Sequence, residues 1–296
     1  MKKNFIFANV TYVILIIMAI LNGNIQTEPE WMLLLCITLT QIFMVYKYKK
    51  GVLGSANIAS IIYVTFILWE IMTKYWGILN PVLCPPLEDI FYVFYSQWQQ
   101  MLVGVLSSLE LLMVGFAVAL TFGVILGIAI GWIKSLSDVL YPIVKVLAPI
   151  PSVIYTPYIV AVMPTFRSAS AMVIILGLFF PLLLQMINRV HTMDKRIINT
   201  ARAMNVSHGG MIFKVILPYC IPGIVGGIKV SLSTSIMILT LAEMMGATSG
   251  MGYFIKNYAD FANYTFVIAG IILVGIVVTI LNKIVVFIEQ RTIRWI

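Results

Sequence analysis

The stretch DKRIINTARAMNVSHGGMIFKVILP, from Asp194 to Pro218, is a basic segment between two apolar runs at 169–188 and 220–243. Each of these runs is long enough to cross a hydrocarbon core about 30 Å thick, which takes about 20 residues of helix. A basic, helix-like segment in this position predicts an insert that leaves the bilayer between two membrane-spanning helices.

The composition of the whole chain is that of an integral membrane protein. Of its 296 residues, 61% are hydrophobic and 10% are charged, and the mean hydropathy is +1.02. A soluble domain has about a quarter of its residues charged. The fold class predicted is an all-α polytopic membrane protein, because the alternating pattern of a β-barrel is absent. Eight spans are expected, at 5–21, 31–46, 56–76, 104–132, 139–163, 169–188, 220–243 and 265–287.

The net charge of +8 follows the expected topology. With the N-terminus inside, the cytoplasmic ends of the spans hold most of the Lys and Arg residues, as the positive-inside rule requires. The outer loops instead hold acidic residues such as Glu28 and Glu88. We therefore expect a multi-pass protein of a bacterial or archaeal cell membrane with both termini cytoplasmic. Its partners include the lipid bilayer and no nucleic acid. No cleavage site follows the first apolar run, which predicts an uncleaved first helix.

Two features divide the chain further. The charged turn KYKKG ends a two-helix extension at 1–50 and precedes a membrane domain at 51–296, which contains the insert at 194–218. Prolines predict that the fifth span is kinked or interrupted; they are Pro142, Pro149, Pro151, Pro157 and Pro164. Glycines four residues apart predict close packing of one helix against another; they are Gly123, Gly127 and Gly131.

The insert has the signals of two short helices. Asp194 is placed to cap the first helix, and Ser207 is placed to cap the second. Asn205 follows the first periodic run, where a helix commonly ends in the left-handed conformation. A stripe at helical spacing is formed by Ile197, Ile198, Ala201 and Met204. Taken alone, this pattern leaves two interpretations open, an interfacial helix lying on the bilayer and a docking element for another protein.

The insert and its flanks resemble the permease subunits of binding-protein-dependent ABC importers. The cytoplasmic signature of that family is E-A-A, three residues, G, nine residues, I-x-L-P. The register here places Asn199, Thr200, Ala201, Asn205, Val215, Leu217 and Pro218 on it. The spacing is intact, but three residues differ from the signature: Asn199 stands in place of Glu, Thr200 in place of the first Ala, and Asn205 in place of Gly.

The flanking segments are similar to the nitrate, sulfonate and taurine branch of that family. They include LAEMMGATSGMGYFI at 241–255 and Trp69–Glu70 followed by NPVLCPP. The likeness covers about residues 65–296, so the first two helices lie outside it. One departure is VMPTFRSAS, with Arg167, where the branch usually has a W-F-G-x-G-like turn.

This resemblance implies a type I ABC importer-like core and a set of partners. The insert would couple to a separate ATPase, with Ala201 and Ala203 allowing close docking and Arg202 pairing with acidic groups. The assembly would hold two ATPase copies, a second permease copy as a homodimer, and an extracellular or periplasmic solute-binding protein. The chain has no G-x-x-x-x-G-K-[ST] phosphate loop, so an ATPase partner is needed. The solute implied is a sulfonate-like or nitrate-like anion, with a vitamin precursor as the alternative.

Polar residues within the spans are candidates for a pathway or gate because they are costly in hydrocarbon. They are Glu110, Lys229, Ser231, Ser235 and Glu243. Structural roles remain open for four of them: Glu110 as a hydrogen-bonding residue, Glu243 as a support for the adjacent glycine-rich turn, and the two serines as intrahelical donors. Lys229 needs a partner of its own. No catalytic residue, metal site or cofactor is predicted. The rival classes are an ion-coupled secondary carrier, which usually has an internal repeat, and a membrane scaffold or enzyme, for which no catalytic motif is present.

Overall fold

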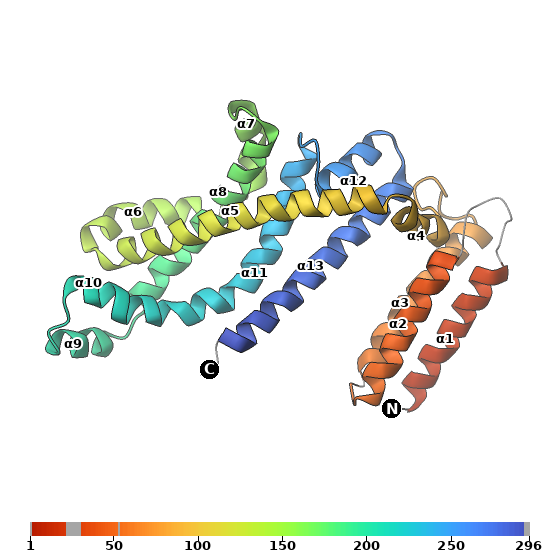
Figure 1. Ribbon diagram of the computed structural model, residues 1–296, viewed down its shortest axis with the longest axis horizontal. Helices are drawn as coiled ribbons and strands as arrows, with labels where there is room; N and C mark the ends of the chain where they lie inside the picture. The colour runs from red at the N-terminus through yellow and green to blue at the C-terminus, as the bar shows by residue number, and fades with distance from the viewer. Residues whose placement is uncertain (1, 22–30, 53, 293–296) are drawn as a thin grey trace. The chain divides into compact units, whose positions relative to one another are not determined.

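The computed structural model describes residues 2–21, 31–52 and 54–292, and within these ranges it is helical with no strand (Figure 1). Its elements are α1 (Lys2–Leu21), α2 (Trp31–Lys49), α3 (Gly54–Glu70), η1 (Ile71–Tyr75), α4 (Leu87–Ser96), α5 (Trp98–Trp132), α6 (Lys134–Leu147), α7 (Ser152–Val162), α8 (Phe166–His191), α9 (Lys195–Ala203), α10 (His208–Gly210), η2 (Met211–Ile216), α11 (Leu217–Met244), α12 (Met251–Asp260) and α13 (Tyr264–Thr292). The predicted all-α class is confirmed.

The membrane-length helices agree with the expected spans except at the seventh, predicted at 220–243. There the membrane-length stretch is His208–Ile228, and the shorter apolar helix Ser231–Met244 follows it. Among the described residues, 7 helices are long and apolar enough to cross a membrane, or 8 if α6 and α7 form one span. The axes of α6 and α7 differ by 96° across a break. Pro149 and Pro151 lie at this break, where a proline removes a backbone donor. The predicted interruption of the fifth span is therefore confirmed.

The chain forms two compact units, Met1–Leu102 with Ile255–Ile272, and Val103–Phe254 with Leu273–Ile296. The sequence-based division into 1–50 and 51–296 stays a prediction. In the first unit, α1 and α2 pack against α3 (Figure 1). Buried polar side chains join the three helices. The Gln41 amide donates to Asn9 Oδ1 at 2.7 Å, and the Tyr63 hydroxyl donates to Gln41 Oε1 at 3.1 Å. These bonds fix the mutual register of the three helices.

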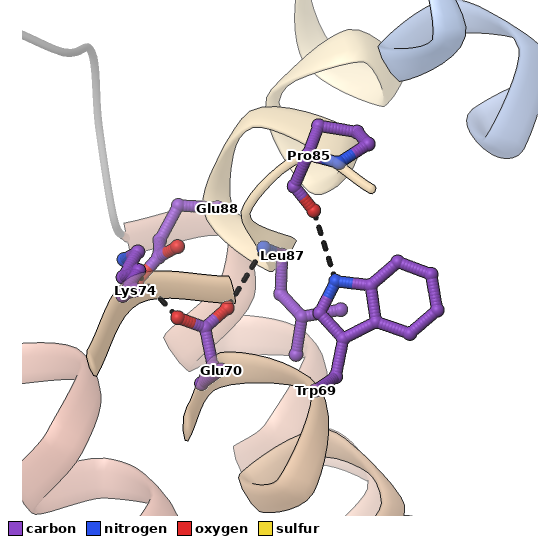
Figure 2. A network of polar contacts seen from close by, with 6 residues as sticks. All are labelled: Trp69, Glu70, Lys74, Pro85, Leu87 and Glu88. Carbon is purple, nitrogen blue, oxygen red and sulfur yellow. Dashed lines mark hydrogen bonds and ion pairs between the residues drawn. The ribbon is translucent and has the colours of Figure 1, made fainter. Parts of the chain in front are cut away.

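An ionic network fastens the loop after η1 to the end of α3 (Figure 2). The Leu87 N–H donates to Glu70 Oε1 at 2.8 Å, so that Glu70 satisfies an orphan donor at the start of α4. Lys74 Nζ lies 3.2 Å from Glu70 Oε2 and 2.8 Å from Glu88 Oε1. The Trp69 indole N–H donates to the Pro85 carbonyl at 2.9 Å. The Trp69–Glu70 pair singled out in the sequence thus holds the loop in place.

Replacing Glu70 by leucine is expected to destabilise the first unit by about 3 kcal/mol, because breaking a buried pair leaves Lys74 without one of its two anions and the Leu87 N–H without its acceptor. The apparent melting temperature of the purified protein measures this loss. Asp260→Ala is the control, because it removes the exposed pair with Lys256 and should cost no more than about 1 kcal/mol. Equal melting temperatures for the two variants would contradict the assignment.

In the second unit, α5 and α8 pack closely along a glycine face. A Cβ placed on Gly127 would lie 2.5 Å from Met186 Cβ, and one on Gly131 would lie 2.8 Å from Val190 Cβ. A Cβ placed on Gly123 would lie 3.2 Å from Leu182 Cβ. The predicted packing of these three glycines is confirmed. The three glycines therefore let α5 and α8 pack closely over several turns.

Candidate functional site

The first helix of the insert, α9, begins and ends as the sequence predicts. Asp194 Oδ1 accepts a hydrogen bond from the Arg196 N–H at 2.8 Å, so Asp194 is the N-cap. Asn205 has a φ of +52°, in the left-handed region, and so ends the helix without glycine. Ser207 Oγ accepts from the Gly210 N–H at 3.2 Å and begins α10. The chain then continues through the π-helix η2 into α11, a feature that the sequence pattern does not signal.

The two faces of α9 have different surroundings. Ala201 is 7% exposed and belongs to a buried cluster with Met193, Met211 and Ile216. Met204 is 73% exposed. The apolar stripe predicted from the sequence is therefore divided. Ala201 and Ile198 pack against the permease itself, whereas Ile197 and Met204 are exposed.

The remaining signature residues lie on both sides of this contact. Those exposed to solvent are Asn199, Thr200, Arg202, Ala203, Asn205 and Pro218. Val215 and Leu217 are half-buried and pack against the cluster around Ala201. An open pocket of about 370 Å³ adjoins the end of α9 and is lined by Trp132, Arg202, Asn205, Val206, His208 and Met211. The insert thus presents a polar surface with three large exposed apolar side chains, Ile197, Met204 and Phe213.

Glu243 forms a second candidate site at the end of α11. Its side chain is buried, with the residue only 1% exposed. Glu243 Oε1 accepts from the Ser108 hydroxyl at 2.6 Å, and Oε2 accepts from the Gly252 N–H at 2.8 Å. Ser108 Oγ in turn accepts from the Met251 N–H at 2.9 Å. Two orphan donors in the first turn of α12 are thereby satisfied, and the turn is tied to α5.

The glycine-rich turn between α11 and α12 depends on this carboxylate. Gly250 has a φ of +124°, and a Cβ there would lie 2.3 Å from the carboxyl carbon of Glu243. A Cβ on Gly252 would lie 2.2 Å from the Thr240 carbonyl oxygen. Gly246, with a φ of +152°, lies against the ring of Phe166. The spacing of glycines in GATSGMG therefore follows from close contacts on both sides of the turn.

The other predicted pathway residues have separate surroundings. Ser235 is fully buried and donates to the Ser231 carbonyl at 2.5 Å, which is the intrahelical alternative weighed for this pair. Arg167 Nη2 lies 2.5 Å from Glu110 Oε2. The side chain of Lys229 lies outside the described part of the structure. The structure thus joins Ser231 to Ser235 and bonds Glu110 and Glu243 to partners outside the predicted set.

Helices of membrane length, an interrupted span and a helical insert define a polytopic all-α membrane protein. The fold is similar to a solved structure titled "Inward facing conformations of the MetNI methionine ABC transporter". The TM-score is 0.59 at 20% identity, and the match covers 67% of this chain and 99% of that one. Residues 119–294 match the family "Binding-protein-dependent transport system inner membrane component". Because this match spans more than half of the chain, the protein belongs to that family.

Curated relatives agree with this membership and are named as permeases. The putative aliphatic sulfonates transport permease protein SsuC of Bacillus subtilis is 28% identical, over 84% of this chain and 88% of the relative. The taurine transport system permease protein TauC of Escherichia coli is 24% identical, over 76% and 86%. The nitrate import permease protein NrtB of Leptolyngbya laminosa is 30% identical, over 69% and 74%. The chain is therefore an ABC importer permease, and the resemblance drawn from the sequence is confirmed.

Proposed function

We propose that this chain forms the translocation pathway of an ATP-driven importer for a small sulfonate-like, taurine-like or nitrate-like anion. Family membership supports the transport role, and the names of the relatives support the solute class. If the solute is instead a vitamin precursor, only the solute class changes and the proposed transport role stays the same. A soluble binding protein delivers the solute to the outer mouth, and two ATPase subunits drive a homodimer of this chain.

The insert at 194–218 is the proposed coupling element. The observation that supports it most is the division of α9 into a face packed on the permease through Ala201 and a face exposed through Arg202, Ala203 and Met204. A helix held firmly on one side can transmit movement from a protein bound on the other. An exposed large apolar side chain beside a charged one suits a protein interface, where aromatic, Met and Arg side chains are enriched.

Within the membrane, Glu243 has the proposed role of a gate support. Its bonds to Ser108 and Gly252 hold the turn before α12, and they support a role in positioning a gate. Ser231 and Ser235 on α11, with Lys229 on the same helix, are proposed to lie along the pathway. Glu110 is also proposed to lie along the pathway, because its charged side chain is exposed.

Co-purification tests the proposed assembly. Tagged permease, produced with a candidate ATPase and binding protein, should be recovered in detergent with two permease and two ATPase copies, as measured by native mass spectrometry. Uptake of labelled taurine, nitrate and ethanesulfonate by cells producing the complex should identify the solute class. A permease that is recovered folded but without any ATPase would contradict the proposal.

A further inference from the structure

The ion pair between Arg167 and Glu110 is unusual for its surroundings. Glu110 lies on a face of α5 whose other exposed side chains are apolar, including Leu106, Met113 and Val114. The side chains of Arg167 and Glu110 are 62% and 63% exposed. An ion pair facing hydrocarbon is costly, so this surface is expected to face water or an aqueous cavity.

Helix lengths place the pair at one membrane boundary. Glu110 precedes Trp132, the last residue of α5, by about six turns, on the order of 33 Å at 1.5 Å per residue. Arg167 precedes Arg189 on α8 by the same length. That distance is about the thickness of the hydrocarbon core. Because the basic ends of these helices are predicted to be cytoplasmic, Glu110 and Arg167 lie at the outer mouth.

The backbone that presents Arg167 is held firmly, whereas its side chain is accessible. Thr165 and Ser168 form a capping box at the start of α8, and the ring of Phe166 lies against Gly246. The α5–α8 glycine contacts hold the two helices that supply the pair together. A guanidinium has five N–H donors, and the contact with Glu110 is made through Nη2. The exposed edge can therefore receive an incoming oxyanion, which can then take the place of Glu110.

We infer that Arg167 receives the anionic group of the solute at the outer mouth, with Glu110 as the internal counter-ion that the solute replaces. This inference rests on the proposed function and adds a specificity-determining residue to it. An exposed ion pair contributes little to folding stability, so exchange of one oxyanion for another is readily reversible. The guanidinium suits sulfonate, nitrate and carboxylate oxygens because it can donate two parallel hydrogen bonds.

The experiment measures solute imported per ATP hydrolysed by the complete complex in proteoliposomes, with taurine, nitrate and ethanesulfonate as probes. Arg167→Gln is expected to lower this ratio about ten-fold, because ATP is still hydrolysed while the solute is not retained. Combining Arg167→Glu with Glu110→Arg keeps the ion pair but reverses it, so the ratio should stay low. Glu110→Gln removes the counter-ion with which the solute competes for Arg167, so it should raise the ratio above the wild-type value. Lys256→Gln, which breaks the exposed pair with Asp260, is the matched control and should change nothing.

The inference is overturned if Arg167→Gln leaves the ratio unchanged, or if the reversed pair restores it, since a purely structural pair would tolerate reversal. It is also overturned if the wild-type complex imports a neutral solute and none of the three anions, while the importer assignment stands. Absence of ATP-dependent import of any solute by the folded wild-type complex would instead contradict the proposed function, and the inference would fail with it.

Discussion

Replacing Met204 by glutamate is expected to lower ATP-dependent uptake at least ten-fold and to release the ATPase from the purified complex. Met204 is 73% exposed at the end of α9, next to the exposed Arg202 and Ala203. In the proposed complex this side chain is buried against the ATPase, and burying an unpaired carboxylate there is strongly unfavourable. A ten-fold change corresponds to about 1.4 kcal/mol of binding free energy. Uptake and ATPase recovery on the tagged permease measure the effect.

The controls separate docking from folding. Lys134→Glu changes an exposed residue at the start of α6, predicted to lie on the same side of the membrane, and should leave ATPase recovery near the wild-type level. Ala201→Asp should act differently from Met204→Glu, because Ala201 is buried in the permease and its replacement should lower the melting temperature. Normal uptake and ATPase recovery by Met204→Glu would contradict the coupling role of this surface.

Replacing Glu243 by alanine is expected to destabilise the second unit by about 3 kcal/mol and to abolish uptake. The substitution leaves the Ser108 hydroxyl and the Gly252 N–H without their acceptor in a buried place, and each loss costs about 1–3 kcal/mol. Glu243→Gln should give an intermediate loss, since its single amide oxygen replaces two acceptor oxygens. The melting temperature in detergent and the rate of uptake measure both variants.

A glycine pair provides the matched test of this turn. Gly250→Ala places a Cβ 2.3 Å from the Glu243 carboxyl carbon at a positive φ, so it should destabilise the protein strongly. Gly275→Ala in α13 meets no atom within 4 Å and should be neutral or slightly stabilising. If Gly250→Ala and Glu243→Ala both have the melting temperature of the wild type, the turn does not depend on this carboxylate.

Features with a local cause were predictable from the sequence. The spans follow from long apolar runs, and the 96° break follows from Pro149 and Pro151. The end of α9 follows from the tolerance of asparagine for the left-handed conformation that Asn205 adopts. In each case the structure of a segment is determined by residues within that same segment.

Features that depend on distant partners were not predictable in the same way. Periodicity placed Ala201 and Met204 on one stripe, but only tertiary packing decides that Ala201 is covered and Met204 is not. Nothing local pairs Glu243 with Ser108, which lies 135 residues away, or Glu110 with Arg167. The π-helix η2 likewise has no signal in the hydrophobic pattern. Sequence could therefore propose Glu243 and Glu110 as candidates without supplying their partners.

In the proposed function, ATP and not an ion gradient drives this permease. The most direct measurement is uptake of labelled taurine, nitrate or ethanesulfonate by proteoliposomes that contain the complete complex, with ATP enclosed or omitted and with ionophores present. We expect uptake that requires enclosed ATP and the binding protein and that continues when ionophores abolish all ion gradients. Uptake that proceeds without ATP and stops when an ion gradient is abolished would contradict the account and would assign the chain to the ion-coupled carriers.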